Sequence, residues 1–340
     1  MPEADLIIIG AGPAGMSAAA TAARGGLNVL LLDEQPGPGG QIYRNVGRTR
    51  AFRTWLGKDY AKGGQWVDAL DHPGITTEFG ASVWSIEAGP RVAWSRHGVS
   101  TISTAPHVLL ATGAQERPVP IPGWTLPGVM SAGAAQILMK TAGMLPKDTV
   151  LAGSGPLLYL IAAQLIDAGC PPKALVETQN RRMMLNAAQH LPRALFGLPT
   201  LLKGLGLVRK INAAGVRRFV GTTGFMAKPH GQGAIAFTFS CKGRQETLVT
   251  DLLLTHQGVI PSTHMTRAAG IVHEWNTAQA AFQPVTDTWG ATNVAGLHVA
   301  GDGAGIGGAE TAAASGERAA LIILHLSGRI SADTCLQPAS

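Results

Sequence analysis

The sequence of 340 residues predicts an α/β protein with two Rossmann-like dinucleotide-binding domains, the second inserted in the first. Two glycine-rich turns predict this fold, because each follows an apolar run typical of a buried parallel strand, at 6–9 and at 150–152. A late apolar strand that runs into a Gly-Asp pair indicates that the carboxyl-terminal part returns to complete the first domain.

The first glycine turn has the spacing of a pyrophosphate-binding loop. It is formed by Gly10, Gly12, Pro13, Ala14 and Gly15. Gly10 permits the tight turn, Gly12 lets backbone amides approach a pyrophosphate, and Gly15 lets the next helix lie close to the strand. The Ala-rich residues 16–24 predict that helix. The turn therefore predicts a site for a cofactor that carries ADP.

The second apolar strand ends in an acidic pair. Residues 29–32 predict the strand, and Asp33 and Glu34 follow it directly. Asp33 comes about 20 residues after the glycines, where a carboxylate binds ribose hydroxyls. We therefore assign Asp33 and its neighbour Glu34 to the same cofactor site.

A second acidic residue follows the late strand, at Gly301 and Asp302, and a helix is expected over 309–327. This order places Asp302 where a carboxylate can bind a ribityl chain. It also directs the helix N-terminus, at Gly308 and Ala309, toward a ring that becomes anionic when reduced, which the helix dipole favours.

The chain contains two further segments that a simple nicotinamide dehydrogenase would not need. One is the strand expected over 108–113, and the other is the sequence GGQIYR at 39–44, after the second strand. The candidate cofactor-binding residues in these segments are Gly40, Gln41, Arg44, Thr112 and Gly113.

These motifs, with the second glycine turn and the late GD, resemble the two-dinucleotide-domain flavoprotein family that includes thioredoxin reductase. Longer segments narrow the resemblance; they are GGQIYR at 39–44, GAQERP at 113–118, PGWTLPGV at 122–129 and GSGPLL at 153–158. They are similar to the alpha (A) subunits of heteromeric FAD-dependent amine and imino-acid dehydrogenases. This group comprises opine oxidase, D-hydroxyproline and proline dehydrogenase, hydrogen cyanide synthase and part of heterotetrameric sarcosine oxidase.

The resemblance implies a flavin-binding electron-transfer subunit of a complex that oxidises an opine, proline or hydroxyproline. Substrate oxidation is then expected on a partner subunit that contains its own FAD. In this chain FAD is expected in the first domain, with Arg44 on the electron-rich side of the flavin. A loop clamp is the alternative role for Gln41 and Arg44, and spacing alone identifies no catalytic residue.

Two other functions stay open at this point. One is a stand-alone NAD(P)H-dependent flavin reductase that feeds an external acceptor. The other is an assembly subunit with a structural adenine nucleotide, because the glycine turn recognises an ADP half that FAD, NAD and ATP share in part.

The order of the motifs predicts three segments. Residues 1–123 are the first part of the FAD-binding domain, 124–258 are an inserted NAD(P)-binding-like domain, and 259–340 complete the FAD-binding domain. The Pro- and Gly-rich residues 117–123 and 258–261 are the expected linkers.

The inserted domain departs from the dinucleotide pattern. Leu158 replaces the third glycine of its turn, and its bulk is expected to push the helix away from the strand. Glu177 follows the second strand, where an acid favours NAD over NADP, while Arg181 and Arg182 can bind phosphate. A working nicotinamide site and a scaffold without the ligand both stay open.

Cysteine and histidine usage excludes several activities. Cys170, Cys241 and Cys335 form no C-x-x-C pair, which excludes a disulfide reductase. Three such thiols cannot supply the usual four ligands of an iron–sulfur cluster, so another chain must bring any cluster. The ten histidines have no metal-binding spacing, and His256 is expected in the interior.

The net charge of +6 is concentrated in residues 178–245, which contain no Asp or Glu. Apolar residues recur there at helical spacing; they are Leu191, Leu195, Leu198, Leu202, Leu205, Val208 and Ile211. One interpretation is a core stripe beside solvated cations. The other is a docking surface for an acidic partner, such as a small 2Fe–2S subunit. Nucleic acid is not expected, because aromatic residues do not accompany the cations.

The composition, with 46% hydrophobic and 14% charged residues, excludes a disordered protein. The N-terminus has no basic region before its first apolar run, and that run is too short for a signal peptide or a membrane span. We therefore expect a cytoplasmic location and no membrane span.

Overall fold

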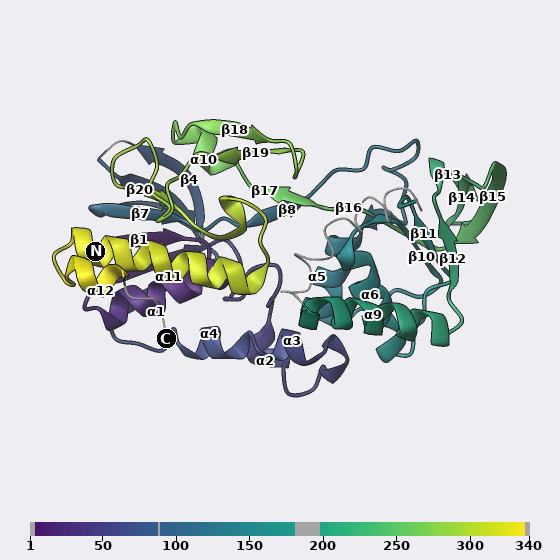
Figure 1. Ribbon diagram of the computed structural model, residues 1–340, viewed down its shortest axis with the longest axis horizontal. Coiled ribbons are helices and arrows are strands. Elements are labelled where there is room, and N and C mark those ends of the chain that lie inside the picture. The colour runs from purple at the N-terminus through teal and green to yellow at the C-terminus, as the bar shows by residue number, and fades with distance from the viewer. Residues whose placement is uncertain (1–3, 88, 181–197, 337–340) are drawn as a thin grey trace. The chain divides into compact units, whose positions relative to one another are not determined.

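The computed structural model describes residues 4–87, 89–180 and 198–336. The chain divides into two compact units. Figure 1 shows the chain coloured by residue number, from purple at the N-terminus to yellow at the C-terminus. The first unit consists of Met1–Thr54, Lys58–Gln115 and Val259–Ser340, and the second of Trp55–Gly57 and Glu116–Gly258. Residues 116–123, which the sequence analysis assigns to the first domain, thus fall in the second unit.

The first unit is built on a five-stranded parallel sheet with the order β20-β7-β1-β2-β3. Its strands are β1 (Leu6–Ile9), β2 (Val29–Asp33), β3 (Ile75–Phe79), β7 (His107–Leu110) and β20 (Leu297–Val299). In the central strand β1, Leu6 pairs with Val29 of β2 and with His107 of β7. All residues of β1 are buried, as expected for an apolar strand covered on both faces.

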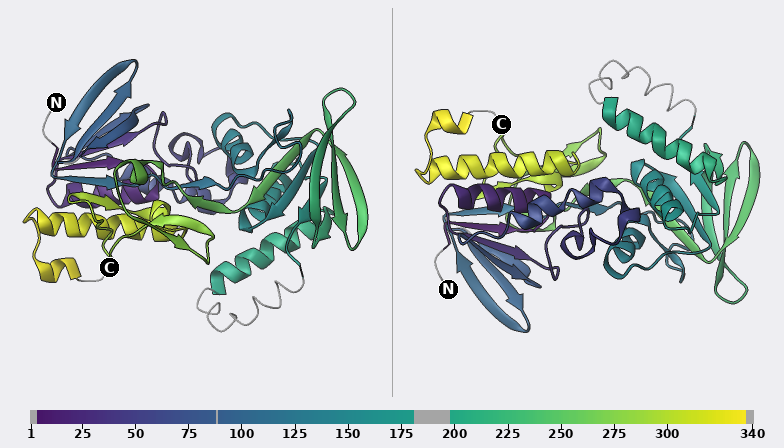
Figure 2. Two further views of the ribbon diagram at one scale, coloured as in Figure 1. Left: turned by 90° about the horizontal axis from the view of Figure 1, so that it is seen from above. Right: turned by 90° about the horizontal axis from the view of Figure 1, so that it is seen from below.

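Helices cover one face of this sheet, and a three-stranded meander covers the other (Figure 2). The covering elements are α1 (Pro13–Arg24), α11 (Ala309–Leu326), β4 (Ser82–Glu87), β5 (Arg91–Arg96) and β6 (Val99–Thr104). Helices α1 and α11 are in close contact at Gly316. A Cβ atom there would lie 2.0 Å from the Ala14 carbonyl oxygen, so only glycine fits at this position. The meander begins at β4, because β3 pairs in parallel with β2 and belongs to the sheet, whereas β4 and β5 pair in antiparallel fashion.

The second unit repeats this three-layer plan around a parallel sheet with the order β12-β11-β10-β16-β9. The strands of this sheet are β9 (Val129–Ser131), β10 (Thr149–Ser154), β11 (Ala174–Glu177), β12 (Arg217–Val220) and β16 (Leu252–Gln257). One face packs on α5 (Ala132–Ala142), α6 (Pro156–Asp167) and α9 (Leu198–Ala213). The other packs on the meander of β13 (Thr223–His230), β14 (Ala234–Cys241) and β15 (Arg244–Thr250).

The remaining elements in the described part of the chain are short. They are α2 (Val46–Thr49), α3 (Lys58–Ala61), α4 (Gly64–Asp68), α10 (His264–Ala268), α12 (Ala332–Leu336), β8 (Ala114–Glu116), β17 (Val259–Pro261), β18 (His273–Asn276), β19 (Ala281–Pro284) and the 3-10 turns Thr54–Leu56 and Gly301–Gly303. No helix in the described part of the chain combines the length and apolar character of a membrane span. The two parallel sheets confirm the predicted α/β class with one Rossmann-like unit inserted in the other.

Candidate functional site

Candidate residues from four distant segments meet at one edge of the first unit's sheet. Gly10 follows β1, and Asp33 ends β2. Thr112 follows β7, and Gly301 follows β20. These strands are parallel neighbours, so their carboxyl ends open on the same side. In open parallel sheets this edge is where ligands bind.

The first glycine turn is closed by backbone packing. Gly10 has a φ of +107°, and a Cβ atom there would lie 2.4 Å from the Ala111 carbonyl oxygen. A Cβ atom on Gly15 would lie 1.8 Å from the Gly10 carbonyl oxygen, so α1 needs glycine there to pack on β1. Helix α1 begins at Pro13, earlier than expected, because proline suits a first turn whose N–H groups lack intrahelical partners. Gly12 is the N-cap and supplies no side-chain cap, which leaves amides for an anion.

Backbone amides hold Asp33 at the end of β2. The Ala11 amide donates to Oδ2 at 2.5 Å, and the Gln35 amide donates to Oδ1 at 2.8 Å. Burial raises the pKa of the Asp33 carboxyl group, against the opposing effect of these two amides. The carboxylate therefore has a fixed orientation beside the glycine turn and keeps lone pairs for ribose hydroxyls. Its neighbour Glu34 is exposed and accepts a hydrogen bond from the Gln35 side chain.

The segment 39–44 folds back on the glycine turn. The Gly39 amide donates to the Ala11 carbonyl at 2.8 Å. Gly40 follows with a φ of +57°, and its backbone lies directly against Gly12. The structure therefore brings the GGQIYR segment onto the turn that is expected to hold a pyrophosphate.

Arg44 turns back on its own loop. Its Nε donates to the Gly40 carbonyl at 3.2 Å, and its Nη1 donates to the Gln35 side chain. Its Nη2 makes a longer contact of 3.4 Å with Oε1 of the exposed Gln41. The buried Tyr60 donates a hydrogen bond from its hydroxyl to the Arg44 carbonyl at 2.7 Å. These contacts agree with the loop clamp that was the alternative role for Gln41 and Arg44, and the place of Arg44 beside a flavin stays a prediction.

Asp302 fixes the loop that leads into α11. Its Oδ1 accepts hydrogen bonds from the amides of Gly307 at 2.9 Å and Gly308 at 3.0 Å. Gly308 is the N-cap of α11, and Ala309 begins the helix. Among the described residues, no hydrogen bond reaches Oδ2 of Asp302. One carboxylate oxygen therefore shapes the loop, and the other is available to a ligand.

Two serines that no sequence motif reveals support this edge. The Thr112 hydroxyl donates to the Ser262 carbonyl at 3.2 Å, and the Ser262 amide donates to the Gly113 carbonyl at 2.9 Å. The Gly301 amide donates to Ser315 Oγ at 3.0 Å. Because both serines come from distant segments, spacing within the glycine motifs gives no signal for them.

The second glycine turn differs from the first at its third position. A Cβ atom on Gly153 would lie 1.7 Å from the His256 carbonyl oxygen, a close approach like that of Gly10 in the first unit. Leu158 stands where the first turn has Gly15, and its side chain is buried in the core between α6 and the sheet. Glu177 ends β11 as expected, but it forms an ion pair with Arg218.

His256 is buried and hydrogen bonded in the second unit. Its Nδ1 lies 2.6 Å from Glu116 Oε1, and Glu116 Oε2 accepts from the Gly133 amide at 2.8 Å. These contacts join the end of β16 to the start of α5. They give His256 the structural role of an interior histidine.

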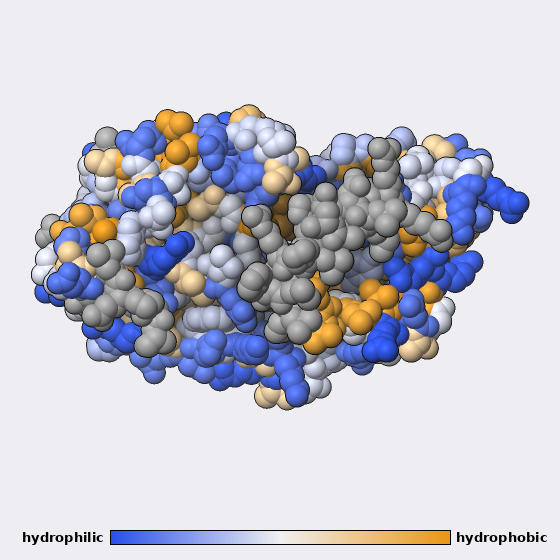
Figure 3. Space-filling model, viewed as in Figure 1, coloured by the Kyte–Doolittle hydropathy of each residue, from blue (hydrophilic) through white to orange (hydrophobic). Residues whose placement is uncertain are grey.

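The acid-free residues 178–245 are only partly described. Outside the described residues lie Arg181, Arg182, Leu191 and Leu195. On α9, Leu202 and Leu205 are 59% and 53% exposed, whereas Ile211 is buried, and apolar residues show on the surface there (Figure 3). The core-stripe interpretation is therefore wrong for Leu202 and Leu205. Among the cations, Lys210 pairs with Asp167 at 2.7 Å.

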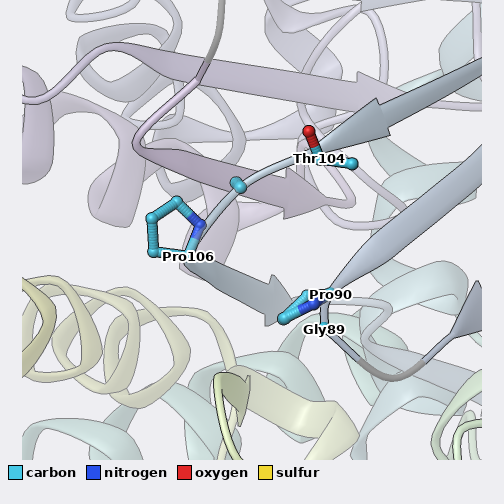
Figure 4. A pocket seen from close by; sticks show the side chains of 5 residues that line it. Gly89, Pro90, Thr104 and Pro106 are labelled. Atoms are coloured by element: carbon cyan, nitrogen blue, oxygen red, sulfur yellow. The ribbon is translucent and has the colours of Figure 1, made fainter.

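A surface pocket of the first unit lies away from the candidate site (Figure 4). It is lined by Gly89, Pro90, Thr104, Ala105 and Pro106. The last three precede β7, so the pocket lies at the amino edge of the sheet. Thr104 is the one lining residue with a polar side chain, and the pocket contributes nothing to the cofactor site.

The cysteines are free thiols; Cys170 and Cys241 are partly buried, and Cys335 is buried. Within the described residues, no group of three His, Cys, Asp or Glu side chains is placed to hold a metal ion. The described part of the chain therefore presents neither a disulfide nor a metal centre.

Sequence comparison matches residues 4–318 to the pyridine nucleotide-disulphide oxidoreductase family. The opine oxidase A subunit of Agrobacterium tumefaciens (strain Ach5) is 45% identical over 94% of this chain, which spans 65% of that protein. The corresponding opine oxidase protein of Rhizobium meliloti (strain 1021) is 41% identical, with 96% of this chain and 72% of that protein covered. Hydrogen cyanide synthase subunit HcnB of Pseudomonas aeruginosa is 31% identical, with 94% and 70% covered.

Solved structures show the same fold at low identity. L-proline dehydrogenase from P. horikoshii matches with a TM-score of 0.71 and 18% identity, over 96% of this chain and 56% of that one. T. acidophilum thioredoxin reductase matches with a TM-score of 0.69 and 18% identity, over 96% and 99%. The resemblance stated from the motifs is thereby confirmed. The chain belongs to the pyridine nucleotide-disulphide oxidoreductase family, in the group of the opine oxidase A subunits and their relatives.

Proposed function

We propose that this chain is the FAD-binding electron-transfer subunit of a heteromeric dehydrogenase that oxidises an imino or amino acid of the opine, proline or hydroxyproline class. The observation that carries the proposal is the meeting of the glycine turn, Asp33 and Asp302 at one sheet edge. Asp33 ends β2 and Asp302 follows β20, on opposite sides of β1. Three strand spacings of about 4.8 Å separate these strands, or roughly 14 Å.

This separation favours a dinucleotide over a mononucleotide. FAD has a ribose at one end and a ribityl chain at the other, joined by a pyrophosphate. The amides after Gly12 would hold the pyrophosphate, Asp33 the ribose and Oδ2 of Asp302 the ribityl chain. ATP or AMP has no second sugar chain for Asp302. The arrangement therefore fits FAD better than the structural adenine nucleotide that a purely assembly role would require.

FAD supplies redox chemistry when bound, because it accepts an electron pair and passes it on. The protein residues bind and orient it. The N-terminus of α11, at Gly308 and Ala309, favours the negative charge that accompanies reduction. Asp302 holds that N-terminus in place through its bonds to the Gly307 and Gly308 amides.

Oxidation of the substrate is assigned to a partner subunit. The similar proteins are named as subunits, in opine oxidase, hydrogen cyanide synthase and sarcosine oxidase. In the described part of this chain, Asp33 and Asp302 are both bonded to backbone amides, which suits binding better than proton transfer. The proposed partners are a substrate-oxidising subunit that contains FAD and a small acidic 2Fe–2S subunit.

The test is to identify the cofactor of the purified chain by its absorption spectrum and by the mass of the released molecule. The wild type should be yellow, and Gly12→Val should lose most of its flavin, because the added side chain fills the space beside Gly40. Gly37→Val is the matched control, since a Cβ atom on Gly37 meets nothing within 4 Å. A colourless wild type that releases ATP or AMP would contradict the proposal and favour the assembly subunit.

A further inference from the structure

The acidic residue after the second strand is held differently in the two units. In the first unit, the backbone amides of Ala11 and Gln35 hold Asp33 with one hydrogen bond to each carboxylate oxygen, so each oxygen keeps a lone pair for a ligand. Glu177 has the corresponding place in the second unit, as the last residue of β11 and paired with Gly153 of the glycine turn. Partners for Glu177 come from side chains instead of from the turn.

Arg218 engages both carboxylate oxygens of Glu177. Its Nη2 lies 2.8 Å from Oε1 and 2.9 Å from Oε2, and its Nε lies 3.2 Å from Oε1. The side chain of Glu177 is 4% exposed and that of Arg218 is 22% exposed. Arg218 belongs to β12, the strand next to β11, so the sheet itself positions the pair. A charge pair with this geometry and burial is among the stronger hydrogen-bonded contacts in proteins.

Tyr159, on α6, lies beside the same ion pair. Its ring centroid lies 5.8 Å from the guanidinium carbon of Arg218. Burial and the neighbouring Glu177 carboxylate raise the pKa of Tyr159 to about 12, so the phenol keeps its proton. Tyr159 directly follows Leu158, which fills the position of the third glycine. Side chains of this chain therefore occupy the region where the ribose of a second dinucleotide would bind.

We propose that Arg218 and Tyr159 take the place of a nucleotide ribose as the partners of Glu177, so that the second unit does not bind NAD(P)H. The family implies a pyridine nucleotide, but these residues do not fit one. A ribose would have to break the buried ion pair and leave one charge without its partner, which is strongly unfavourable. The inference deepens the proposed function and rests on it for one consequence: electrons reach this chain from a partner subunit rather than from a nicotinamide.

The first test is calorimetric titration of the purified flavoprotein with NADH, NADPH and ADP-ribose. No saturable binding is expected up to millimolar concentration. The second test is thermal unfolding of Arg218→Met, which should lower the apparent Tm of the second unit by roughly 10 °C, because Glu177 is left buried and unpaired. Adding Glu177→Gln to that variant should restore most of the loss. Arg217→Met is the matched control, since Arg217 is exposed on the same strand, and its Tm should stay unchanged.

Two results would overturn the inference. Saturable binding of any of the three nucleotides, weakened by Glu177→Gln, would show that the carboxylate serves a ribose. An unchanged Tm in Arg218→Met would show that the ion pair does not hold Glu177. Flavin content separates this inference from the proposed function. A yellow protein that binds NADH overturns the inference alone, and a colourless protein without nucleotide binding overturns the proposed function alone.

Discussion

A Cβ atom on Gly40 would lie 2.8 Å from the Cα atom of Gly12, so the GGQIYR loop and the first glycine turn touch through backbone alone. The two segments are joined further by the hydrogen bond from the Gly39 amide to Ala11. Because this contact forms within the first unit itself, the turn is shaped before any ligand binds. Such preorganisation favours binding, because less conformational entropy is lost when the ligand orders the loop.

Gly40→Ala should therefore weaken FAD binding about tenfold. The new Cβ atom meets Gly12, and alanine at a φ of +57° costs about 1–2 kcal/mol. The measurement is fluorescence titration of the flavin-free protein with FAD. Gly37→Ala is the control, because its backbone is not left-handed and nothing lies within 4 Å of the added atom. Equal affinity in the two variants would refute a role for this contact.

Asp302→Ala should lose most of its flavin during purification. The change removes the acceptor of the Gly307 and Gly308 amides together with the oxygen assigned to the ribityl chain. Asp302→Asn keeps one acceptor oxygen and should retain an intermediate amount. The flavin-to-protein absorbance ratio reports the result, and Asp71→Ala, at an exposed position, serves as the control. Full flavin retention in Asp302→Ala would exclude this carboxylate from the site.

His298 should make the first unit less stable in acid. Its Nε2 lies 3.3 Å from His107 Nδ1, and its own Nδ1 is buried without a partner among the described residues. Burial, and then the neighbouring His107, lower the pKa of His298 to about 4. In the unfolded chain this histidine takes up a proton near pH 6.5, so the full free energy of unfolding is kept above that pH. As the pH falls from 6.5 toward 4, the free energy of unfolding decreases by at most about 3 kcal/mol.

Urea unfolding at a series of pH values measures this effect. His298→Leu should flatten the fall in the urea midpoint between pH 6.5 and pH 4, because the group that must take up a proton is gone. His264→Leu, at an exposed position on α10, should keep the wild-type slope. A wild-type slope in His298→Leu as well would assign the acid sensitivity to other groups.

Exposed cations of the acid-free segment should attract an acidic partner subunit. Lys210 and Arg218 are unsuitable for the test, because they pair with Asp167 and Glu177 inside the second unit. Reversing the exposed Arg209 and Arg217 to Glu should weaken assembly several-fold and reduce its salt dependence. Surface charges are screened beyond about 8 Å at physiological ionic strength.

The control for assembly reverses two exposed cations of the first unit, Arg48→Glu with Arg329→Glu, for the same change in net charge. Analytical ultracentrifugation at low and high salt compares the complexes. Equal weakening by both pairs of reversals would show a general charge effect and no docking on the acid-free segment.

The sequence predicts those parts of the fold and site that are encoded locally. The residues from Gly10 to Gly15 lie on one turn, and their spacing alone indicates a tight loop between strand and helix. Leu202 and Leu205 show the limit of periodicity, since an apolar helical face can be exposed as well as buried.

The partners of Glu177 illustrate a second limit. Arg218 reaches it through pairing of β11 with β12, and Tyr159 reaches it from α6. These contacts depend on how distant elements pack. Motif spacing therefore predicts the position of Glu177 but not its ion pair with Arg218.

The most direct test of the account is stopped-flow measurement of flavin reduction in the native complex and in this chain alone. We expect an imino-acid substrate to bleach the flavin of this chain only when the partner subunits are present. NADH should leave the isolated chain oxidised on the same timescale. Rapid bleaching of the isolated chain by NADH would contradict the account and identify the protein as a stand-alone flavin reductase.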